Sequence, residues 1–563
     1  MRPSYRTEIP WRGFIAALLT LSLVAPAALA QQGGAATAAK PAAASSLTAA
    51  EREALARVRV ETVREVATAL SSKEMEGRGT AQPGGERAAK YLADRFAKLG
   101  LKPLGDAGTY LQAVKFKSAQ VLPETSLKAG DATLKHGEDF VMPPPFTYDE
   151  ADATGGVVFV GYGVTSEELK RDDLKGLDLK GKIVVALSGR PANVDAAVWQ
   201  RANAQKVPAL FMRGIAGLVI AGVGSPQQPF NVISNYLSRR QVGLASAPVP
   251  PMKLPPVLLA SDAAAEKLFA GSGTTYAQAL AKAQTGEATS RDLGREATLH
   301  VRVKREEGTG SNVVAVLEGS DAKLKEEAIV YSAHYDAYGI NPAGVIFPGA
   351  ADNALGTSMI VSIAEALSKT SPRPRRSVIF LAVTGEEYGL LGARHWVNNP
   401  TWPIEKVAAN INHDSAGTEI YAPVKNLVGW GQEHSTLGPV FEGAVAATGN
   451  SVATDPLPEE NIFVRSDHYE FVKKGVPALM MAGFPGGDQA PHLARLKKWM
   501  DTDYHSPRDV ILPDWEWSGP QTVAQVGLLV GLRVANADAA PSWLPSSRFN
   551  KPRGAGAPAP PAN

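Results

Sequence analysis

The sequence of 563 residues contains no cysteine. Disulfide bonds are therefore excluded, and so is the cysteine that a bacterial lipid anchor requires. Thiolates are also missing as metal ligands, so any metal ion must be bound by nitrogen and oxygen atoms alone. Candidate metal ligands are for that reason restricted to histidines and carboxylates.

Neither sign of charge dominates the composition. The 58 Lys and Arg residues against 56 Asp and Glu residues leave a formal net charge of +2, which argues against nucleic acid as a partner. Hydrophobic residues make up 44% and charged residues 20% of the chain, as in a globular protein. A chain of this length predicts two or three domains.

Beyond the first thirty residues, the sequence has no apolar run long enough for a transmembrane helix. Within them, three arginines precede an apolar run at 14–24, and Ala28-Leu29-Ala30 offers a small-residue cleavage site. This pattern predicts a signal peptide over residues 1–30. The alternative, a membrane anchor, requires a longer apolar run. The mature protein is therefore expected to be exported, either periplasmic or secreted, without stable membrane insertion.

Composition divides the remaining chain. Residues 31–48 are rich in Ala, Gln and Gly and predict a disordered linker, and residues 541–563, rich in Pro, Ala and Gly, predict a disordered tail. Between them we distinguish three segments, at 49–130, 131–295 and 296–540.

The middle segment, residues 131–295, contains short β-rich runs bounded by glycines. Two of them are "GGVVFVGYGV" at 155–164 and "GKIVVALSG" at 181–189. This pattern of short β-rich runs and glycines predicts a separately packed β-rich module. The module would be inserted into a domain made of the two flanking segments.

From residue 296 onward, strand patterns alternate with helix patterns, which is typical of a layered α/β fold. One expected helix places Leu355, Met359, Ile363 and Leu367 at three- and four-residue spacing, as a core-facing helix requires. The expected strands lie at 328–333, 377–384, 407–412 and 476–482.

Residues that can bind metal follow these strands. In chain order they are His334, Asp336, Asp352, Glu386, Glu387, Asp414 and His505. Because open α/β sheets place their sites at the carboxyl ends of strands, these side chains can converge.

The adjacent pair Glu386 and Glu387 raises the question of a bound cation. Two neighbouring carboxylates directly after a buried strand are costly unless a cation meets them. Taken singly, each candidate has another explanation: a structural histidine, a helix N-cap for Asp352, or a helix start for the glutamates. Taken together they predict two oxygen and nitrogen metal shells that share one carboxylate.

This constellation resembles the di-zinc exopeptidase family of bacterial leucyl aminopeptidases, to which glutamate carboxypeptidase II is related. "EMEGRG" at 74–79 and "RSDHYEFVKKGVPAL" at 465–479 also resemble that family. Residues 157–187 resemble the protease-associated domain that many members carry as an insertion. By motif order, the resemblance covers roughly residues 60 to 535.

The resemblance implies a set of metal ligands. Asp352 would bridge two zinc ions, His334 and Asp414 would complete one zinc shell, and Glu387 and His505 would complete the other. The family usually has two acids before the following asparagine, and here Ala351 replaces the first. The bridging position is the second, which is kept.

The resemblance also implies catalytic roles. Asp336 would hold His334 in its ligating tautomer, and Glu386 would be the general base that takes a proton from the attacking water. Tyr504, next to His505, matches a tyrosine that steadies the oxyanion in some relatives.

The predicted fold is a three-layer α/β/α sandwich with a mixed central sheet, interrupted by the β-rich module. The predicted function is an exported aminopeptidase that hydrolyses the amino-terminal residue of a peptide with a free amino terminus, using a water activated by two zinc ions. The alternatives are a carboxypeptidase of the glutamate carboxypeptidase type, a glutaminyl cyclase with one zinc, and a non-catalytic binding protein such as the transferrin receptor. The sequence contains no indication of the oligomeric state.

Overall fold

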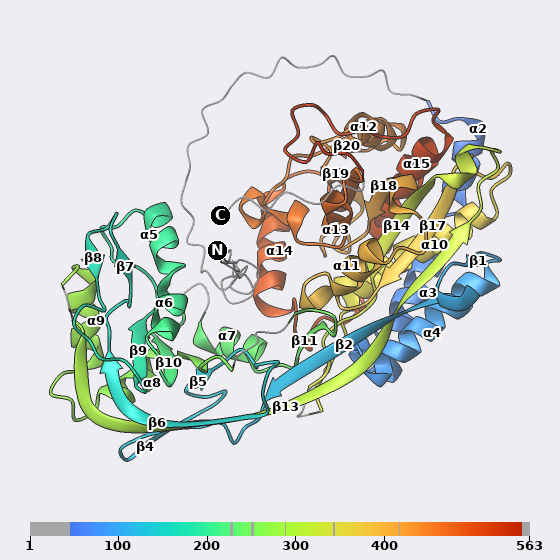
Figure 1. Ribbon diagram of the computed structural model, residues 1–563. Coiled ribbons are helices and arrows are strands. Elements are labelled where there is room, and N and C mark those ends of the chain that lie inside the picture. Colours follow the sequence, from blue (N-terminus) through green and yellow to red (C-terminus); the bar gives the residue numbers. More distant parts are fainter. Residues whose placement is uncertain are drawn as a thin grey trace, which may run out of the picture. The chain divides into compact units, whose positions relative to one another are not determined.

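A computed structural model describes residues 46–225, 229–248, 253–287, 289–341, 344–415 and 417–553. The predicted signal peptide and residues 31–45 of the predicted linker lie outside the described residues. The chain divides into two compact units (Figure 1). The larger unit takes the described residues within 34–116, 243–245 and 308–563, and the smaller unit takes those within 117–242 and 246–307.

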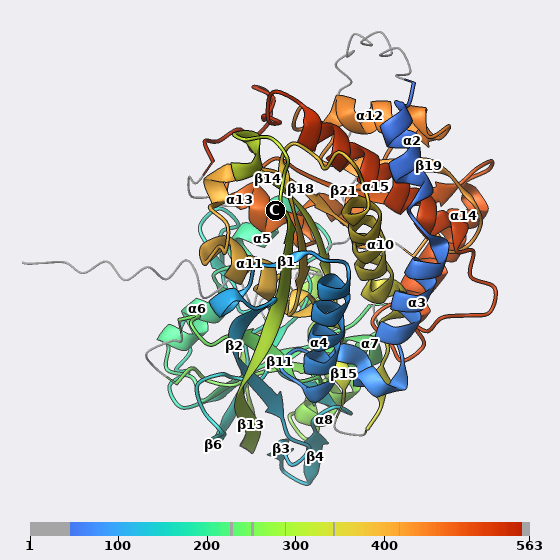
Figure 2. The ribbon, with the colours of Figure 1, turned by 90° about the vertical axis from the view of Figure 1, so that its right-hand side faces the viewer.

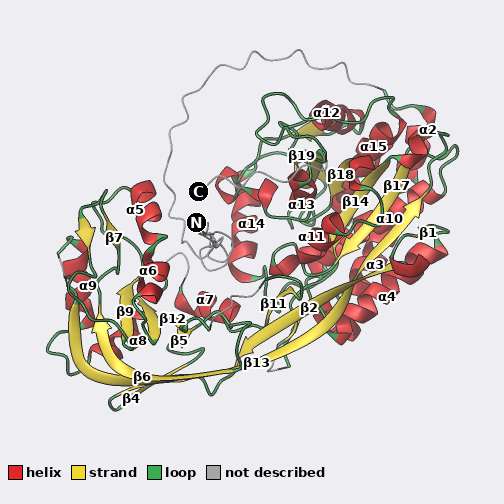
Figure 3. Cartoon of the chain, viewed as in Figure 1, coloured by secondary structure: helices red, strands yellow, loops and turns green. Residues whose placement is uncertain are grey.

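The larger unit is built on a mixed sheet (Figure 3). Its central strands β17, β14, β18 and β21 are parallel, and β13 and β19 pair with them antiparallel on the two sides. Across the sheet the order is β1 (Lys102–Pro103), β13 (Arg291–Leu317), β17 (Ser377–Val383), β14 (Ala328–His334), β18 (Val407–Asn412), β21 (Ala478–Pro485), β19 (Val424–Trp430) and β20 (Ser451–Val452). The four parallel strands are those that the sequence predicts.

Helices cover both faces of this sheet (Figure 2). On one face, the core contains residues of α2 (Ala49–Ala56), α3 (Val60–Leu70), α4 (Pro83–Lys98), α10 (Gly356–Ser368), α12 (Leu437–Ala447) and α15 (Ser518–Asn536). On the other face, α11 (Leu391–Asn398) and α13 (His468–Lys473) contribute to the core. The predicted three-layer α/β/α sandwich is confirmed.

Every residue of β14, β17 and β18 is buried, because both faces of the sheet are covered. Their sequences are accordingly mostly apolar, and the buried polar residues Ser332, Asn410 and Asn412 hydrogen-bond to one another. Alternate residues serve opposite cores: Ile329 and Tyr331 face one helical layer, and Val330 faces the other. None of the described helices combines the length and apolarity needed to cross a membrane.

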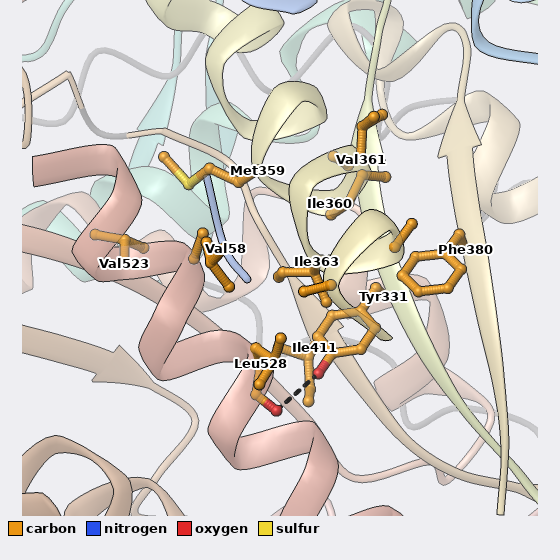
Figure 4. Packing of buried hydrophobic residues seen from close by; sticks show 14 of the residues in the cluster. Val58, Tyr331, Met359, Ile360, Val361, Ile363, Phe380, Ile411, Val523 and Leu528 are labelled. Carbon is orange, nitrogen blue, oxygen red and sulfur yellow. Dashed lines mark hydrogen bonds between the residues drawn. The ribbon is translucent and has the colours of Figure 1, made fainter. Parts of the chain in front are cut away.

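Tyr331 fixes the packing of α15 on the sheet. Its ring stacks on Phe380 with centroids 5.7 Å apart, and its hydroxyl donates hydrogen bonds to the carbonyls of Gly527 (3.0 Å) and Leu528 (3.3 Å) (Figure 4). A Cβ atom at Gly531, one turn further along α15, would lie 1.9 Å from the Tyr331 hydroxyl. The helix can approach the sheet this closely only because residue 531 has no side chain.

The smaller unit has its own sheet. Its parallel strands are β6 (Glu150–Phe159), β9 (Ile183–Leu187), β10 (Gly217–Ala221) and β12 (Val257–Ala260), with β5 (Phe140–Val141) antiparallel at the edge. Two short strands, β3 (Ser126–Ala129) and β4 (Ala132–Lys135), extend it through β13. Its helices are α5 (Ala196–Asn203), α6 (Lys206–Met212), α7 (Phe230–Leu237), α8 (Asp262–Phe269) and α9 (Tyr276–Gln284).

The smaller unit extends beyond the predicted module of 131–295 at both ends. It begins at Lys117 and ends at Glu307, because β2 (Leu111–Val121) and β13 are long strands with residues in both units. None of the predicted metal ligands lies in this unit. Its likeness to a protease-associated domain stays a prediction.

Residues 541–553 pack against the rest of the larger unit, which differs from the disordered tail predicted for 541–563. Trp543 and Phe549 are buried, and the indole nitrogen of Trp543 donates a hydrogen bond to the Gly475 carbonyl at 2.9 Å. Two large aromatic side chains outweigh the Pro, Ala and Gly composition of the segment. Residues 554–563 lie outside the described residues.

We expect Gly531→Ala to lower the free energy of unfolding by about 1–3 kcal/mol, since the added methyl group overpacks the contact with Tyr331. Tyr331→Phe should cost about 0.5–1.5 kcal/mol through its lost hydrogen bonds. The double variant should be more stable than the sum of the two changes predicts, because the hydroxyl is the atom that the new methyl group meets first. Denaturant unfolding of the three variants measures this coupling, and strictly additive values would contradict the packing.

Candidate metal centre

The candidate ligands lie at one edge of the larger unit's sheet. His334 is the last residue of β14, Glu387 follows β17, and Asp414 follows β18. Because these three strands are parallel, their carboxyl ends meet at the same edge. Asp352 lies in the turn before α10, and His505 follows α14 (Ala490–Thr502).

The five predicted ligands come together in two groups. In the first, Nε2 of His334 lies 3.2 Å from Oδ1 of Asp352 and 3.4 Å from Oδ1 of Asp414. In the second, Nε2 of His505 lies 3.1 Å from Oδ2 of Asp352 and 3.1 Å from Oε2 of Glu387. Within each group all ligand atoms are within 4.8 Å of one another. Asp352 contributes one oxygen to each group, which is the arrangement of a bridging carboxylate.

This donor set fits a pair of divalent cations. Two imidazole nitrogens and three carboxylates are ligands that zinc accepts, in a chain without thiolates. His334 is buried, and among the described residues its Nε2 has no hydrogen-bond partner of good geometry although carboxylate oxygens surround it. A metal ion would satisfy this buried nitrogen.

The raised pKa values of two carboxylates at the site also favour the binding of a cation there. Burial raises the pKa of Glu386 well above its ordinary value, and the charges of Asp414 and Asp467 add to the rise. Burial likewise raises the pKa of Glu387, and the charge of Asp352 adds to it. Each of these carboxylates therefore carries its negative charge at a cost that bound cations would remove.

Without metal, the two histidines act as the counter-ions. Burial alone would lower the pKa of His334, but the charges of Glu386 and Asp414 outweigh it and hold the pKa well above its ordinary value. At His505, burial also lowers the pKa, but Glu387 and Asp352 outweigh this effect and raise the pKa to about 9. Metal binding would replace these protons.

The adjacent glutamates diverge. Gly385 precedes them with φ +77°, a left-handed conformation that ends β17 abruptly and begins the short turn Glu386–Tyr388. Glu387 then joins the second ligand group, whereas Glu386 belongs to neither and lies with Oε2 3.9 Å from Nε2 of His334. One carboxylate is thus placed to bind metal and the other to lie beside it.

Asp336 links His334 to Glu386. It is fully buried, and its Oδ1 lies 3.7 Å from Nδ1 of His334 and accepts a hydrogen bond from the Glu386 backbone N–H at 3.2 Å. Its Oδ2 accepts a hydrogen bond from the Thr80 hydroxyl at 3.0 Å. One carboxylate therefore contacts the segments that carry a predicted ligand and the predicted base.

Two tyrosines hold the ring of His505. Tyr504 stacks on it with centroids 3.6 Å apart, and Tyr338 packs its edge against it at 4.9 Å with the hydroxyl 3.3 Å from Nδ1. Burial raises the pKa of Tyr504 well above its ordinary value, so its hydroxyl remains a hydrogen-bond donor. A pocket lies beside this group, lined by Ala337, Tyr338, Phe347, Gly349, Asp352, Glu387, His505, Ser506 and Asp509.

Sequence reasoning missed two buried carboxylates at the site. Asp509 accepts the backbone N–H groups of Ala351 (2.9 Å) and Asp352 (3.0 Å), so it holds the turn that carries the shared ligand. Asp467 is fully buried, and among the described residues neither of its oxygens has a hydrogen-bond partner. Asp467 belongs to the family-like motif "RSDHYEFVKKGVPAL", and Asp509 lies four residues after the predicted ligand His505, so these positions were the available signal.

The fold and these ligand groups define the class of the larger unit: a three-layer α/β unit with a candidate two-metal centre. The profile of the family described as "Peptidase family M28" matches residues 312–530, which include all five ligands. The resemblance to the exopeptidase family is confirmed over these residues.

Curated relatives include peptidases and a receptor. Aminopeptidase YwaD of Bacillus subtilis (strain 168) is 28% identical over 270 residues, which are 46% of this chain and 50% of that protein. Transferrin receptor protein 2 of Mus musculus is 26% identical over 342 residues, which are 56% of this chain and 40% of that protein. The chain thus spans half or less of the length of these relatives.

Solved structures share the fold. An aminopeptidase from Aneurinibacillus sp. strain AM-1 superposes with a TM-score of 0.54 at 18% identity, covering 86% of this chain and 95% of that one. The zinc aminopeptidase BSAP from Bacillus subtilis superposes with a TM-score of 0.51 at 18% identity, covering 84% and 94%. The alignments extend well beyond residues 312–530, so the likeness in fold is not confined to the segment that the family profile matches.

We expect the metal-free protein to lose stability as the pH rises from about 6.5 to about 9. The pKa of His505 is raised to about 9 in the folded state, so the folded protein retains a proton that the unfolded chain has released. The stabilisation is fully present below the unfolded-state pKa and is lost as the pH rises through the folded-state pKa. Melting temperatures across this range should fall less steeply for His505→Gln, and an equal slope in both proteins would contradict the assignment.

Proposed function

We propose that this protein is an exported zinc-dependent exopeptidase that removes amino-terminal residues from peptides. The observation that carries the proposal is the pair of ligand groups that share Asp352, with Glu386 beside them and outside both. Similarity to peptidase family M28 and to named aminopeptidases supports the same reaction class. Export rests on the sequence of residues 1–30 alone.

In this proposal His334 and Asp414 would hold one zinc ion, Glu387 and His505 would hold the other, and Asp352 would be shared by the two. When bound, such a metal pair lowers the pKa of a water molecule and polarises the carbonyl group that is attacked. The residues of this chain have the remaining tasks of moving the proton, orienting the ligands and stabilising developing charge.

Glu386 acts as the general base. It takes a proton from the attacking water and delivers that proton to the nitrogen of the leaving amine as the peptide bond breaks. Two features support this assignment: its side chain is near the first ligand group, and burial raises its pKa, which makes the carboxylate a stronger base. Asp336 orients both His334 and the backbone of Glu386.

Tyr504 stabilises the oxyanion that forms at the attacked carbonyl. Its ring stacks on His505, and its raised pKa keeps the phenol protonated and able to donate a hydrogen bond.

A carboxypeptidase of the glutamate carboxypeptidase type is the closest alternative, because it would use the same ligands. It would need a basic group to bind the terminal carboxylate of its substrate. Of the described residues that line the pocket beside the second ligand group, none is Lys or Arg. Carboxylates outnumber the basic groups Arg78 and Arg465 near the centre, and they favour a substrate with a free ammonium group.

Two further alternatives are weaker. A glutaminyl cyclase would use one zinc ion, whereas the two groups of candidate ligands support a pair. A non-catalytic binding protein is the other alternative, because Transferrin receptor protein 2 is among the relatives. Such a protein would not need two groups of candidate ligands with Glu386 beside them, and this arrangement supports an enzyme instead.

Glu386→Gln should leave zinc content and folding nearly intact and lower kcat about a hundredfold or more, because it removes the general base. Glu387→Gln should instead lower zinc content, because it removes a ligand from the second group. Metal analysis and peptide hydrolysis of the two matched variants test this pair, with the wild type expected to hold two zinc ions per chain. The reverse pattern would exchange the two roles, and a fully active wild type with a single zinc would exclude the bridged pair.

A hexapeptide with a free amino terminus should lose residues one at a time from that end. N-acetylation should reduce cleavage about ten- to a hundredfold or more, because it removes a charged hydrogen bond worth roughly 1.5–3 kcal/mol and adds bulk. Mass analysis of timed digests of the free and acetylated peptides decides between the two exopeptidases. Loss of the carboxyl-terminal residue first from both peptides would identify a carboxypeptidase.

A further inference from the structure

The segment Gly77-Arg78-Gly79-Thr80 lies against the metal centre although it precedes every ligand by more than 250 residues and lies outside the segment that matches the family profile. Gly77 has φ +65°, and a Cβ atom there would lie 2.4 Å from the Phe347 carbonyl and 2.7 Å from the Gly339 carbonyl. Gly79 forms a parallel β-bridge with Ala337. The segment therefore fits between the loop that follows His334 and the loop that precedes Asp352.

Arg78 joins these two loops. It is fully buried, and its guanidinium donates hydrogen bonds to four backbone carbonyls. The acceptors are Tyr335 (2.5 Å) in the loop after the first ligand, Pro348 (2.6 Å) and Gly349 (2.7 Å) in the loop before the shared ligand, and Leu70 (2.7 Å) at the end of α3. The planar guanidinium group of arginine has five N–H donors and can bind all four carbonyls. The ammonium group of lysine has three donors and cannot.

Arg78 is also a permanent cation next to the carboxylate cluster. Burial lowers its pKa to about 10, while the charges of Asp509, Asp336, Asp352 and Glu387 oppose that fall. The side chain therefore stays charged at neutral pH, and its charge partly offsets those carboxylates before any metal binds.

A second residue of the segment reaches the same centre. The hydroxyl of Thr80 is fully buried and donates to Asp336, which contacts His334 and accepts the backbone N–H of Glu386. The four residues thus touch the segments that carry ligands of both groups.

We propose that Arg78 is a positioning residue of the metal centre, a fixed cation that ties the loop after His334 to the loop before Asp352 and keeps the two ligand groups in register for metal binding. The proposal rests on the proposed function, since it requires that these ligands bind metal. It assigns a role to the "EMEGRG" motif, which the catalytic assignments leave without one.

Arg376 supplies a matched control in the same unit. It is equally buried, and its guanidinium donates to Glu327 Oε2 (2.7 Å) and to the carbonyls of Val534 (3.0 Å) and Ala537 at the end of α15. None of these acceptors lies beside a metal ligand. A variant of Arg376 therefore reports what the loss of a buried arginine does to the fold alone.

The test compares Arg78→Lys, Arg78→Met and Arg376→Lys with the wild type. Zinc dissociation constants are measured by chelator competition, and backbone hydrogen exchange of residues 335–339 and 347–353 is measured in the metal-free proteins. Both Arg78 variants should bind zinc about 10- to 100-fold more weakly, and these two loops should exchange faster.

Arg376→Lys should keep the wild-type affinity and the wild-type exchange in both loops, whatever its melting temperature. Arg78→Lys retains the charge and is the variant on which the test depends if Arg78→Met does not fold.

Wild-type zinc affinity in Arg78→Lys would overturn the positioning role and leave the proposed function intact. Equal losses of zinc affinity in Arg78→Lys and Arg376→Lys would also overturn it, because the effect would then be a general loss of stability. A wild-type protein that binds no zinc would overturn the proposed function, and the positioning role with it.

Discussion

The shared carboxylate of Asp352 is the constraint on which the site depends. Its two oxygens lie 3.2 Å from His334 and 3.1 Å from His505, so the two ligand groups have one fixed separation. Asp352 can hold this position because its turn is secured from both sides. Asp509 accepts its backbone N–H, and Arg78 binds the carbonyl of Gly349 three residues earlier. A small shift of this turn would move the shared carboxylate of Asp352 away from both groups at once.

Three of the other four ligands follow neighbouring strands of the sheet. Parallel strands β14, β17 and β18 end together, so His334, Glu387 and Asp414 need only short turns to reach one another. The strands are buried on both faces, which gives the edge a rigid base. Carboxylates can gather there because the positive charges of the histidines and of Arg78 partly balance them, and metal ions would complete that balance.

Much of this could be predicted from residue order alone. Continuous apolar runs mark buried parallel strands, and the ligand-type residues directly after them identify the edge where a site belongs. The two glutamates after β17 could not be told apart in this way, since both are acidic and adjacent. The family resemblance implies different roles for them, and in the structure the left-handed turn at Gly385 separates the side chains, with Glu387 in the second group and Glu386 beside the first.

The sequence by itself indicated the three-layer fold and seven candidate site residues, because hydrophobic runs and ligand-type residues are local patterns, and the family resemblance implied which five of them are ligands. Only the tertiary structure decided what holds those ligands. Arg78 and Thr80 precede them by more than 250 residues, and Asp509 acts through backbone N–H groups that no side-chain pattern marks. Likewise, composition predicted disorder for residues 541–553, where the burial of Trp543 and Phe549 depends on a surface formed by distant segments. Contacts of this kind arise when the folded chain brings remote residues together, so their energies have no signature along the sequence.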